Sequence, residues 1–193
     1  MHETARCFRA MRRLAIGVAV PRLGLETPST APFARASADS RARAWDSVGL
    51  AVRTVAAALP EAGLVLLVPD EAAVPADVAT LAERQLTYPT PPQPPDSVHE
   101  TAEALRRARC DGIVVLALGG ATPYLLAYLA YFAGIERRAA LSAEFGGGVL
   151  TDAVPPPAGA ADDASRHLAL LDALGLRPRA PSGAAHAFSV GGR

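Results

Sequence analysis

Short apolar runs alternate with segments of helical periodicity along this chain. The apolar runs are too short to cross a membrane, and continuous hydrophobicity of this kind is typical of strands buried on both faces; they span 14–20, 64–68, 113–118 and 139–141. Apolar residues at helical spacing fill the segments between or after them, at 48–59, 74–84, 98–109, 124–132 and 160–174. The alternation predicts an α/β fold, a Rossmann-like parallel sheet with helices on both faces.

The stretch from 110 to 157 is the clearest unit of this pattern. Its strand ends at Gly119-Gly120, and Thr122 is placed to cap a helix whose first residue is Pro123. In a parallel sheet the loops that follow the strands form the binding crevice. The segments in which chemistry is expected are therefore 21–46, 69–71, 119–122 and 142–148.

Three groups in or near these loops are candidates for binding. The backbone N–H groups of Gly119 and Gly120, with the helix start at Thr122, suit a phosphate or sugar oxygen, although a plain tight turn is the simpler interpretation. Glu144, beside three glycines, could orient a ligand hydroxyl or be a solvated loop carboxylate. Arg138 could contact an anionic acceptor or be solvated at its turn.

Composition along the chain predicts how it is divided. The three parts are an N-terminal extension (1–13), one domain (14–176), and a disordered tail or the start of an interdomain linker (177–193). Residues 22–43 are rich in proline, serine, threonine, alanine and arginine without a period, which predicts an irregular insertion. Asp46 or Ser47 is then expected to cap the helix that begins at Val48.

Charge and residue usage exclude several classes of function. The nineteen Lys and Arg positions are all arginine, they are scattered, and nineteen acidic residues balance them, so no nucleic-acid partner is expected. No apolar segment approaches the roughly 20 residues of a membrane helix, which predicts a soluble protein without a transmembrane segment. The two cysteines are far apart in the sequence, which predicts free thiols in a reducing cytoplasm. Cys7 and Cys110 lack the spacing of a metal or redox motif, and we expect Cys110 to be an inert packing residue. His99 and His167 are expected at the surface or in packing, and neither a metal nor a resident cofactor is expected.

The unit from 110 to 157, followed by the helix SRHLALLDALGL, resembles the amino-terminal domain of glycosyltransferase family 9, the lipopolysaccharide heptosyltransferase family. The shared layout is carried by Asp111, Gly119-Gly120, Ala133-Gly134-Ile135, Arg137-Arg138, Gly146 to Gly148 and Leu174-Gly175. Upstream, VGLAVRTVAAALPEAGLVLLV at 48–68 resembles the family's first helix, proline turn and second strand. The resemblance covers roughly residues 14–176.

This resemblance implies the amino-terminal half of a GT-B fold and an inverting glycosyltransferase of the heptosyltransferase type. Such an enzyme transfers a sugar from a nucleotide-sugar donor to a glycan or glycolipid acceptor. This half would bind the acceptor, with the candidates Gly119, Gly120, Thr122, Arg138 and Glu144. The donor would be bound by a separate carboxy-terminal domain that this chain lacks. The resemblance is also compatible with peripheral contact at the inner face of a membrane.

The sequence departs from the family at the general base, which is the aspartate of a Gly-Asp pair after the first strand. No such pair is present here. Counting back from Pro60 puts Ala44 at the aspartate position, and Asp46 takes the role if the helix is two residues shorter. Two other functions stay open: a non-catalytic Rossmann-like binding or assembly subunit derived from such an enzyme, and a small flavodoxin-like or nucleotide-binding domain that uses residues 119–122.

Overall fold

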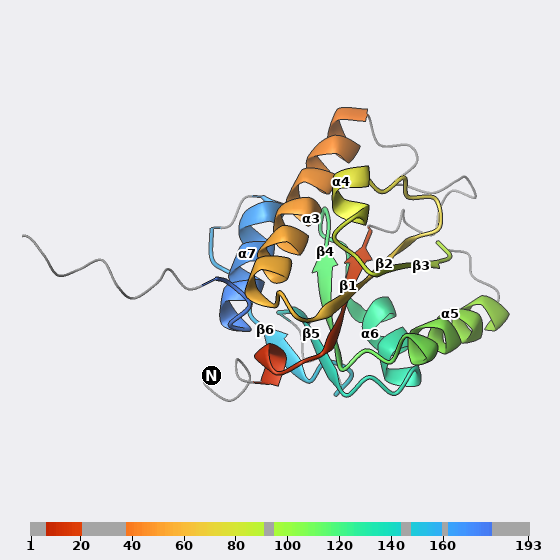
Figure 1. Cartoon of the computed structure of the whole chain (residues 1–193). Coiled ribbons are helices and arrows are strands. Elements are labelled where there is room, and N and C mark those ends of the chain that lie inside the picture. The colour runs from red at the N-terminus through yellow and green to blue at the C-terminus, as the bar shows by residue number, and fades with distance from the viewer. Residues whose placement is uncertain (1–6, 21–37, 91–94, 144–147, 160–161, 179–193) are drawn as a thin grey trace, which may run out of the picture.

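One parallel sheet forms the centre of the molecule (Figure 1). The computed structural model describes residues 7–20, 38–90, 95–143, 148–159 and 162–178. Six strands pair in the order β3-β2-β1-β4-β5-β6, which is the strand order of the Rossmann fold. They are β1 (Arg13–Ala19), β2 (Gly63–Pro69), β3 (Arg84–Tyr88), β4 (Gly112–Ala117), β5 (Arg137–Leu141) and β6 (Asp152–Val154). Each neighbouring pair is parallel, which confirms the predicted sheet.

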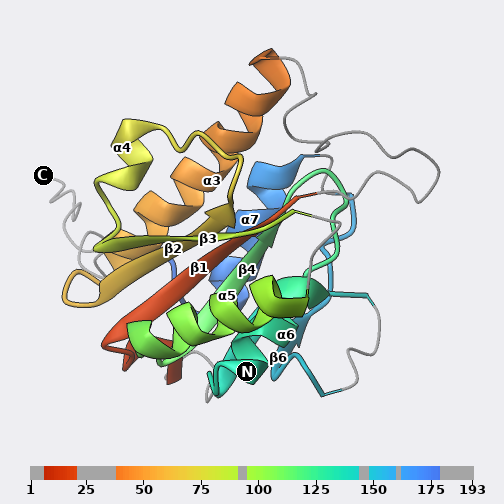
Figure 2. The same ribbon diagram turned by 90° about the vertical axis from the view of Figure 1, so that its right-hand side faces the viewer.

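Helices cover both faces of this sheet, as predicted. They are α3 (Ala38–Ala58), α4 (Ala76–Ala79), α5 (Pro95–Ala108), α6 (Tyr124–Phe132) and α7 (Asp163–Ala173). Figure 2 shows α3, α4 and α7 on one side of the sheet and α5 and α6 on the other. The chain therefore forms three layers around two hydrophobic clusters.

Side chains of β1 alternate between these two clusters. Leu14, Ile16 and Val18 pack with the helices α3 and α7, because successive strand residues point to opposite faces. Ala15 and Ala19 face α5 and α6. Gly17 lies between them, and a Cβ atom there would come within 3.0 Å of a methyl carbon of Leu126 in α6. The small residues of β1 thus allow α6 to pack closely on the sheet.

Helix α3 begins earlier than the sequence predicts. It starts at Ala38, so Asp46 lies within the helix and the predicted cap at Asp46 or Ser47 is wrong. Its first turns contain alanine, arginine and an acidic residue, Asp39, which suit a helix start but carry no apolar period. Of the predicted irregular insertion, residues 38–43 are helical, and 22–37 lie outside the described residues.

Helix α4 is much shorter than the pattern over 74–84 predicts. It ends at Ala79, and the chain turns before β3 begins at Arg84. The N–H of Glu83 donates to the carbonyl of Leu64 at 2.8 Å, so strand pairing begins where the helix was expected to continue. Tertiary hydrogen bonding has overridden local helix propensity here.

The described part of the predicted N-terminal extension packs on the domain. Phe8 is fully buried in the cluster beneath α3 and α7. Arg9 donates to the carbonyl of Gly175 at 2.7 Å, which holds this segment against the end of α7. The predicted tail from 177 onward is described only to residue 178.

Candidate functional site

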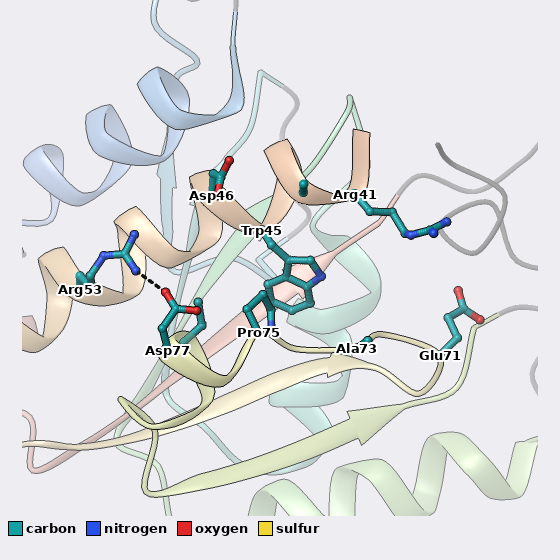
Figure 3. A pocket seen from close by; sticks show the side chains of 10 residues that line it. Arg41, Trp45, Asp46, Arg53, Glu71, Ala73, Pro75 and Asp77 are labelled. Carbon is teal, nitrogen blue, oxygen red and sulfur yellow. Dashed lines mark hydrogen bonds and ion pairs between the residues drawn. The ribbon is translucent and has the colours of Figure 1, made fainter. Parts of the chain in front are cut away.

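A pocket of about 480 Å³ lies beside α3, next to the segment that leads from β2 into α4 (Figure 3). Its volume is within the range of sites that hold small molecules. It lies near the end of β2, and ligands of open α/β folds bind at the carboxyl ends of the strands. The residues that line it are Arg41, Ala42, Trp45, Asp46, Arg53, Glu71, Ala73, Pro75, Asp77 and Val78.

Trp45 supplies the large apolar surface of this pocket. It is the single tryptophan of the chain, and it is 6% exposed. Its indole extends from α3 toward Pro75 in Figure 3, and it belongs to the same hydrophobic cluster as Val48 and Val78. The packing of α3 on the sheet therefore fixes the aromatic wall.

Glu71 follows β2 closely and reaches the pocket from the other side. The hydroxyl of Thr90 donates to its Oε2 at 2.6 Å, which holds the carboxylate in place. Its Oε1 is buried and has no hydrogen-bond partner among the described residues. A carboxylate can accept about four hydrogen bonds, so Glu71 retains capacity for a ligand.

An ion pair joins the two walls at the far end of the pocket. Arg53 of α3 lies 3.0 Å from Asp77 of α4, and both side chains are largely exposed. An exposed pair of this kind contributes about 0–1 kcal/mol to stability. Its main effect on the site is that each charge neutralises the other.

Asp46, the predicted base, lines this pocket from α3. Its side chain is exposed, and in Figure 3 the carboxylate points away from the indole of Trp45. A ligand that contacts Asp46 would therefore do so at the rim of the pocket.

The predicted glycine turn lies at the end of β4. Gly119 and Gly120 have φ angles of 54° and 79°, which only glycine adopts readily. The N–H of Gly119 donates to Oδ2 of Asp163 at 3.0 Å, so the first turn of α7 already supplies the anion that this N–H was predicted to bind. Thr122 is exposed, and α6 has no side-chain cap hydrogen bond at its start.

Arg138 lies at the opposite end of the sheet, near the start of β5. It is 7% exposed, and its guanidinium donates to the carbonyls of Val149, Glu136, Ile135 and Gly148. It also stacks over the ring of Tyr131, with 5.4 Å between the guanidinium carbon and the ring centroid. These contacts give Arg138 a structural role. It lies at the start of β5, whereas the pocket lies near the carboxyl end of β2.

The structure thus separates the predicted site residues into three places. Asp46 lines the pocket, the 119–122 turn ends β4, and Arg138 packs at the other end of the sheet. Glu144 lies outside the described residues. Glu71 lies in the 69–71 segment, where chemistry was expected, but it was not among the predicted site residues. Its position just after a buried strand could have indicated it.

Two titratable groups outside the pocket have shifted pKa values. Burial raises the pKa of the Cys110 thiol to about 11, so the thiol is protonated at neutral pH and a poor nucleophile, as expected for a packing residue. Burial lowers the pKa of His167, which is 1% exposed on α7. Nε2 of this ring lies 3.3 Å from the carbonyl of Ala117, and its Nδ1 has no partner within the described part of the chain.

Neither a membrane-spanning helix nor a metal cluster is found in the described ranges. Within the described ranges, no helix combines the length and the apolar character needed to cross a bilayer. No group of three or more His, Cys, Asp or Glu side chains in those same ranges is arranged to hold a metal ion.

Comparison with known proteins identifies the fold. No protein-family model matches the chain, and no curated protein matches its sequence. A glycosyl transferase family 9 protein from Veillonella parvula matches 86% of the chain in structure, with a TM-score of 0.53 and 10% sequence identity. The chain has the fold of part of a family 9 glycosyltransferase.

A second solved structure, the ADP-heptose lipopolysaccharide heptosyltransferase II of E. coli, matches 83% of the chain with a TM-score of 0.48 and 19% identity. The chain spans 41% of the length of the Veillonella protein and 40% of the E. coli protein. The match to the Veillonella protein confirms, at the level of the fold, the family 9 resemblance predicted from the sequence.

Proposed function

We propose that this chain is the acceptor-binding half of a glycosyltransferase of the heptosyltransferase type. The complete enzyme transfers a sugar from a nucleotide-sugar donor to a glycan or glycolipid acceptor. The observation that carries the proposal is the pocket beside α3, because it combines a tryptophan wall with carboxylates near the end of a parallel strand. The family 9 fold supports the same interpretation.

The donor site belongs to a part of the enzyme outside this chain. Two observations support that division. The chain spans 41% of the length of the family 9 protein. The N–H of Gly119, in the turn best suited to a phosphate, already donates to Asp163, whose charge would repel a diphosphate. The proposal places the protein in the cytoplasm, at the inner face of the membrane when the acceptor is a glycolipid.

Asp46 is the proposed general base. The acceptor sugar lies in the pocket with its attacking hydroxyl at the rim, within reach of the Asp46 carboxylate. Asp46 takes the hydroxyl proton, the oxygen forms a bond to the anomeric carbon of the donor, and the nucleoside diphosphate leaves with the electron pair of the broken bond. Attack on the face opposite the leaving group inverts the anomeric centre.

A transfer assay with matched variants tests this proposal. The full reading frame that contains this chain is assayed with ADP-heptose and deacylated lipopolysaccharide core. Removal of a general base typically costs about 10²-fold or more in rate, so Asp46→Asn is expected to lower kcat by that amount while acceptor binding is retained. Asp172→Asn, which changes an exposed carboxylate of α7 outside the pocket, is the control and should retain full activity.

The alternative is a non-catalytic binding or assembly subunit derived from such an enzyme. The Asp163 carboxylate on Gly119 favours it, since a turn that is closed by the protein itself has no need of a ligand. Acceptor binding without transfer by the full reading frame would support this alternative. Unchanged turnover in Asp46→Asn would remove only the assignment of the base.

A further inference from the structure

The charges around the pocket constrain what it can bind. Three carboxylates and two guanidinium groups line it, which gives the lining one net negative charge. Arg53 is paired with Asp77, so this guanidinium is already neutralised by the protein. The Glu71 carboxylate lines the pocket and would repel a phosphate there, and in a partly buried site that repulsion is only weakly screened.

Carboxylates and an aromatic wall are instead the groups that recognise sugar hydroxyls and the apolar face of a sugar ring. The Glu71 carboxylate can only accept hydrogen bonds, and hydroxyl groups donate them. The bond from Thr90 fixes the carboxylate through Oε2, while buried Oε1 makes no bond among the described residues. A buried polar atom left in this state calls for a partner.

We infer that the pocket beside α3 binds an uncharged sugar unit and that Glu71 holds it by accepting hydrogen bonds from its hydroxyl groups. This inference rests on the proposed function and narrows the acceptor to one whose terminal unit carries no phosphate. Glu71 is then the anchor of the acceptor, and Asp46 at the rim is left for the attacking hydroxyl.

Tryptophan fluorescence tests the inference directly, because Trp45 is the single tryptophan of the chain and lines the pocket. The chain is titrated with the methyl glycosides of glucose, mannose and L-glycero-D-manno-heptose and with the corresponding sugar phosphates. We expect a saturable change in emission with at least one neutral glycoside and about 10-fold weaker binding of its phosphate. Tighter binding of the phosphates, or no response to any neutral glycoside, would overturn the inference.

Substitutions at Glu71 and Thr90 test whether the Glu71 carboxylate is responsible for glycoside binding. Loss of a hydrogen bond to a charged group costs about 10-fold or more in affinity, so Glu71→Ala is expected to weaken glycoside binding by that factor. Thr90→Val, which frees the carboxylate, should weaken it less, and Thr90→Ser should retain it because the donor hydroxyl remains. Asp172→Asn is the control at an exposed site outside the pocket. Unchanged affinity in both Glu71→Ala and Thr90→Val would contradict the role of Glu71.

A parallel titration with deacylated lipopolysaccharide core separates the two proposals. If the core binds but the sugar phosphates outcompete the neutral glycosides, the inference about the uncharged unit fails and the proposed function stands. If neither the core nor any glycoside binds, both fail. Circular dichroism of each variant verifies that it is folded before its affinity is compared.

Discussion

Polar groups at the two ends of the sheet are treated differently by the fold. At the amino-terminal end, each of the three guanidinium nitrogens of Arg138 donates to a backbone carbonyl, and Asp111 accepts from the N–H groups of Arg12 and Arg13. Toward the carboxyl-terminal end, Glu71 and His167 each have one buried atom without a partner among the described residues. Arg138 and Asp111 thus find hydrogen-bond partners within the protein, whereas Glu71 and His167 each have one buried atom that finds none in the described part of the chain.

This difference indicates that the amino-terminal end of the sheet contributes to stability and that the carboxyl-terminal end carries the candidate functional site. A buried polar group whose bonds are complete stabilises one arrangement of the chain, whereas an incomplete one costs free energy in the folded state. A cost of that kind is most easily explained where a ligand supplies the missing bond. Glu71 lies in the pocket and fits this explanation. His167 is not among the residues that line the pocket, so it is the exception that needs a separate test.

The largest change in the free energy of unfolding is expected for Arg138→Ala. Its removal leaves several carbonyls at the β5 turn without their donor and opens a cavity beneath Tyr131. We expect the free energy of unfolding to fall by about 2–4 kcal/mol, measured by urea denaturation. Glycoside affinity of the folded fraction should be unchanged, because Arg138 does not line the pocket.

Two further variants sharpen this expectation. Arg107→Ala, at an exposed position of α5, should change stability by less than about 0.5 kcal/mol. Arg138→Lys keeps the charge but loses the planar fork, so it should lie between the other two. A loss of glycoside binding in folded Arg138→Lys would contradict the structural role and restore Arg138 as an acceptor residue.

Most of the fold could be predicted from the sequence because the buried strands have a clear hydrophobic pattern. Continuous apolar runs marked β1, β2 and β4, and the alternation with helices was enough to predict the parallel sheet. The start of α3 was missed because its first turns have no apolar period. The end of α4 was missed because strand pairing at Glu83, which is a tertiary contact, stops the helix.

The candidate site was predicted less well, because a site depends on contacts between distant residues. Thr90 lies 19 positions from Glu71, and no local pattern shows that its hydroxyl holds that carboxylate. The N–H of Gly119 is bonded to Asp163, 44 positions away, so the anion at this turn could not be read from the glycines alone. Arg138 looked like a solvated or ligand-binding residue because its carbonyl partners have no sequence signature.

A smaller loss of stability is expected when Asp111 is replaced, at the same amino-terminal end of the sheet. Its Oδ2 accepts from the N–H groups of Arg12 and Arg13 at 2.8 and 2.9 Å, which ties the start of β4 to the start of β1. Asp111→Ala removes both bonds at an exposed position, so we expect the free energy of unfolding to fall by about 1 kcal/mol. Asp111→Asn keeps an acceptor oxygen and should lose less. Equal losses in both variants would show that the charge, and not the pair of hydrogen bonds, stabilises this end.

The smallest effect concerns His167 and appears only as a dependence on pH. Burial lowers the pKa of His167 more than the carbonyl of Ala117, the charge of Asp163 and the backbone of Ser47 raise it, so the ring is neutral in the folded protein at neutral pH. The unfolded chain therefore binds a proton more readily than the folded one. The stability that the neutral ring contributes is fully present above the unfolded pKa of about 6.5 and is lost as the pH falls through the lower folded value.

Urea denaturation between neutral and mildly acidic pH measures this dependence, with two glutamine variants for comparison. His167→Gln should flatten the fall in stability, since an amide can still donate to the carbonyl of Ala117 but does not titrate. His99→Gln should leave the fall as it is in the parent chain, because His99 is exposed on α5. If His167→Gln instead lowers stability equally at every pH, the fall in stability comes from other titrating groups, and the contrast between the two ends of the sheet would then rest on Glu71 alone.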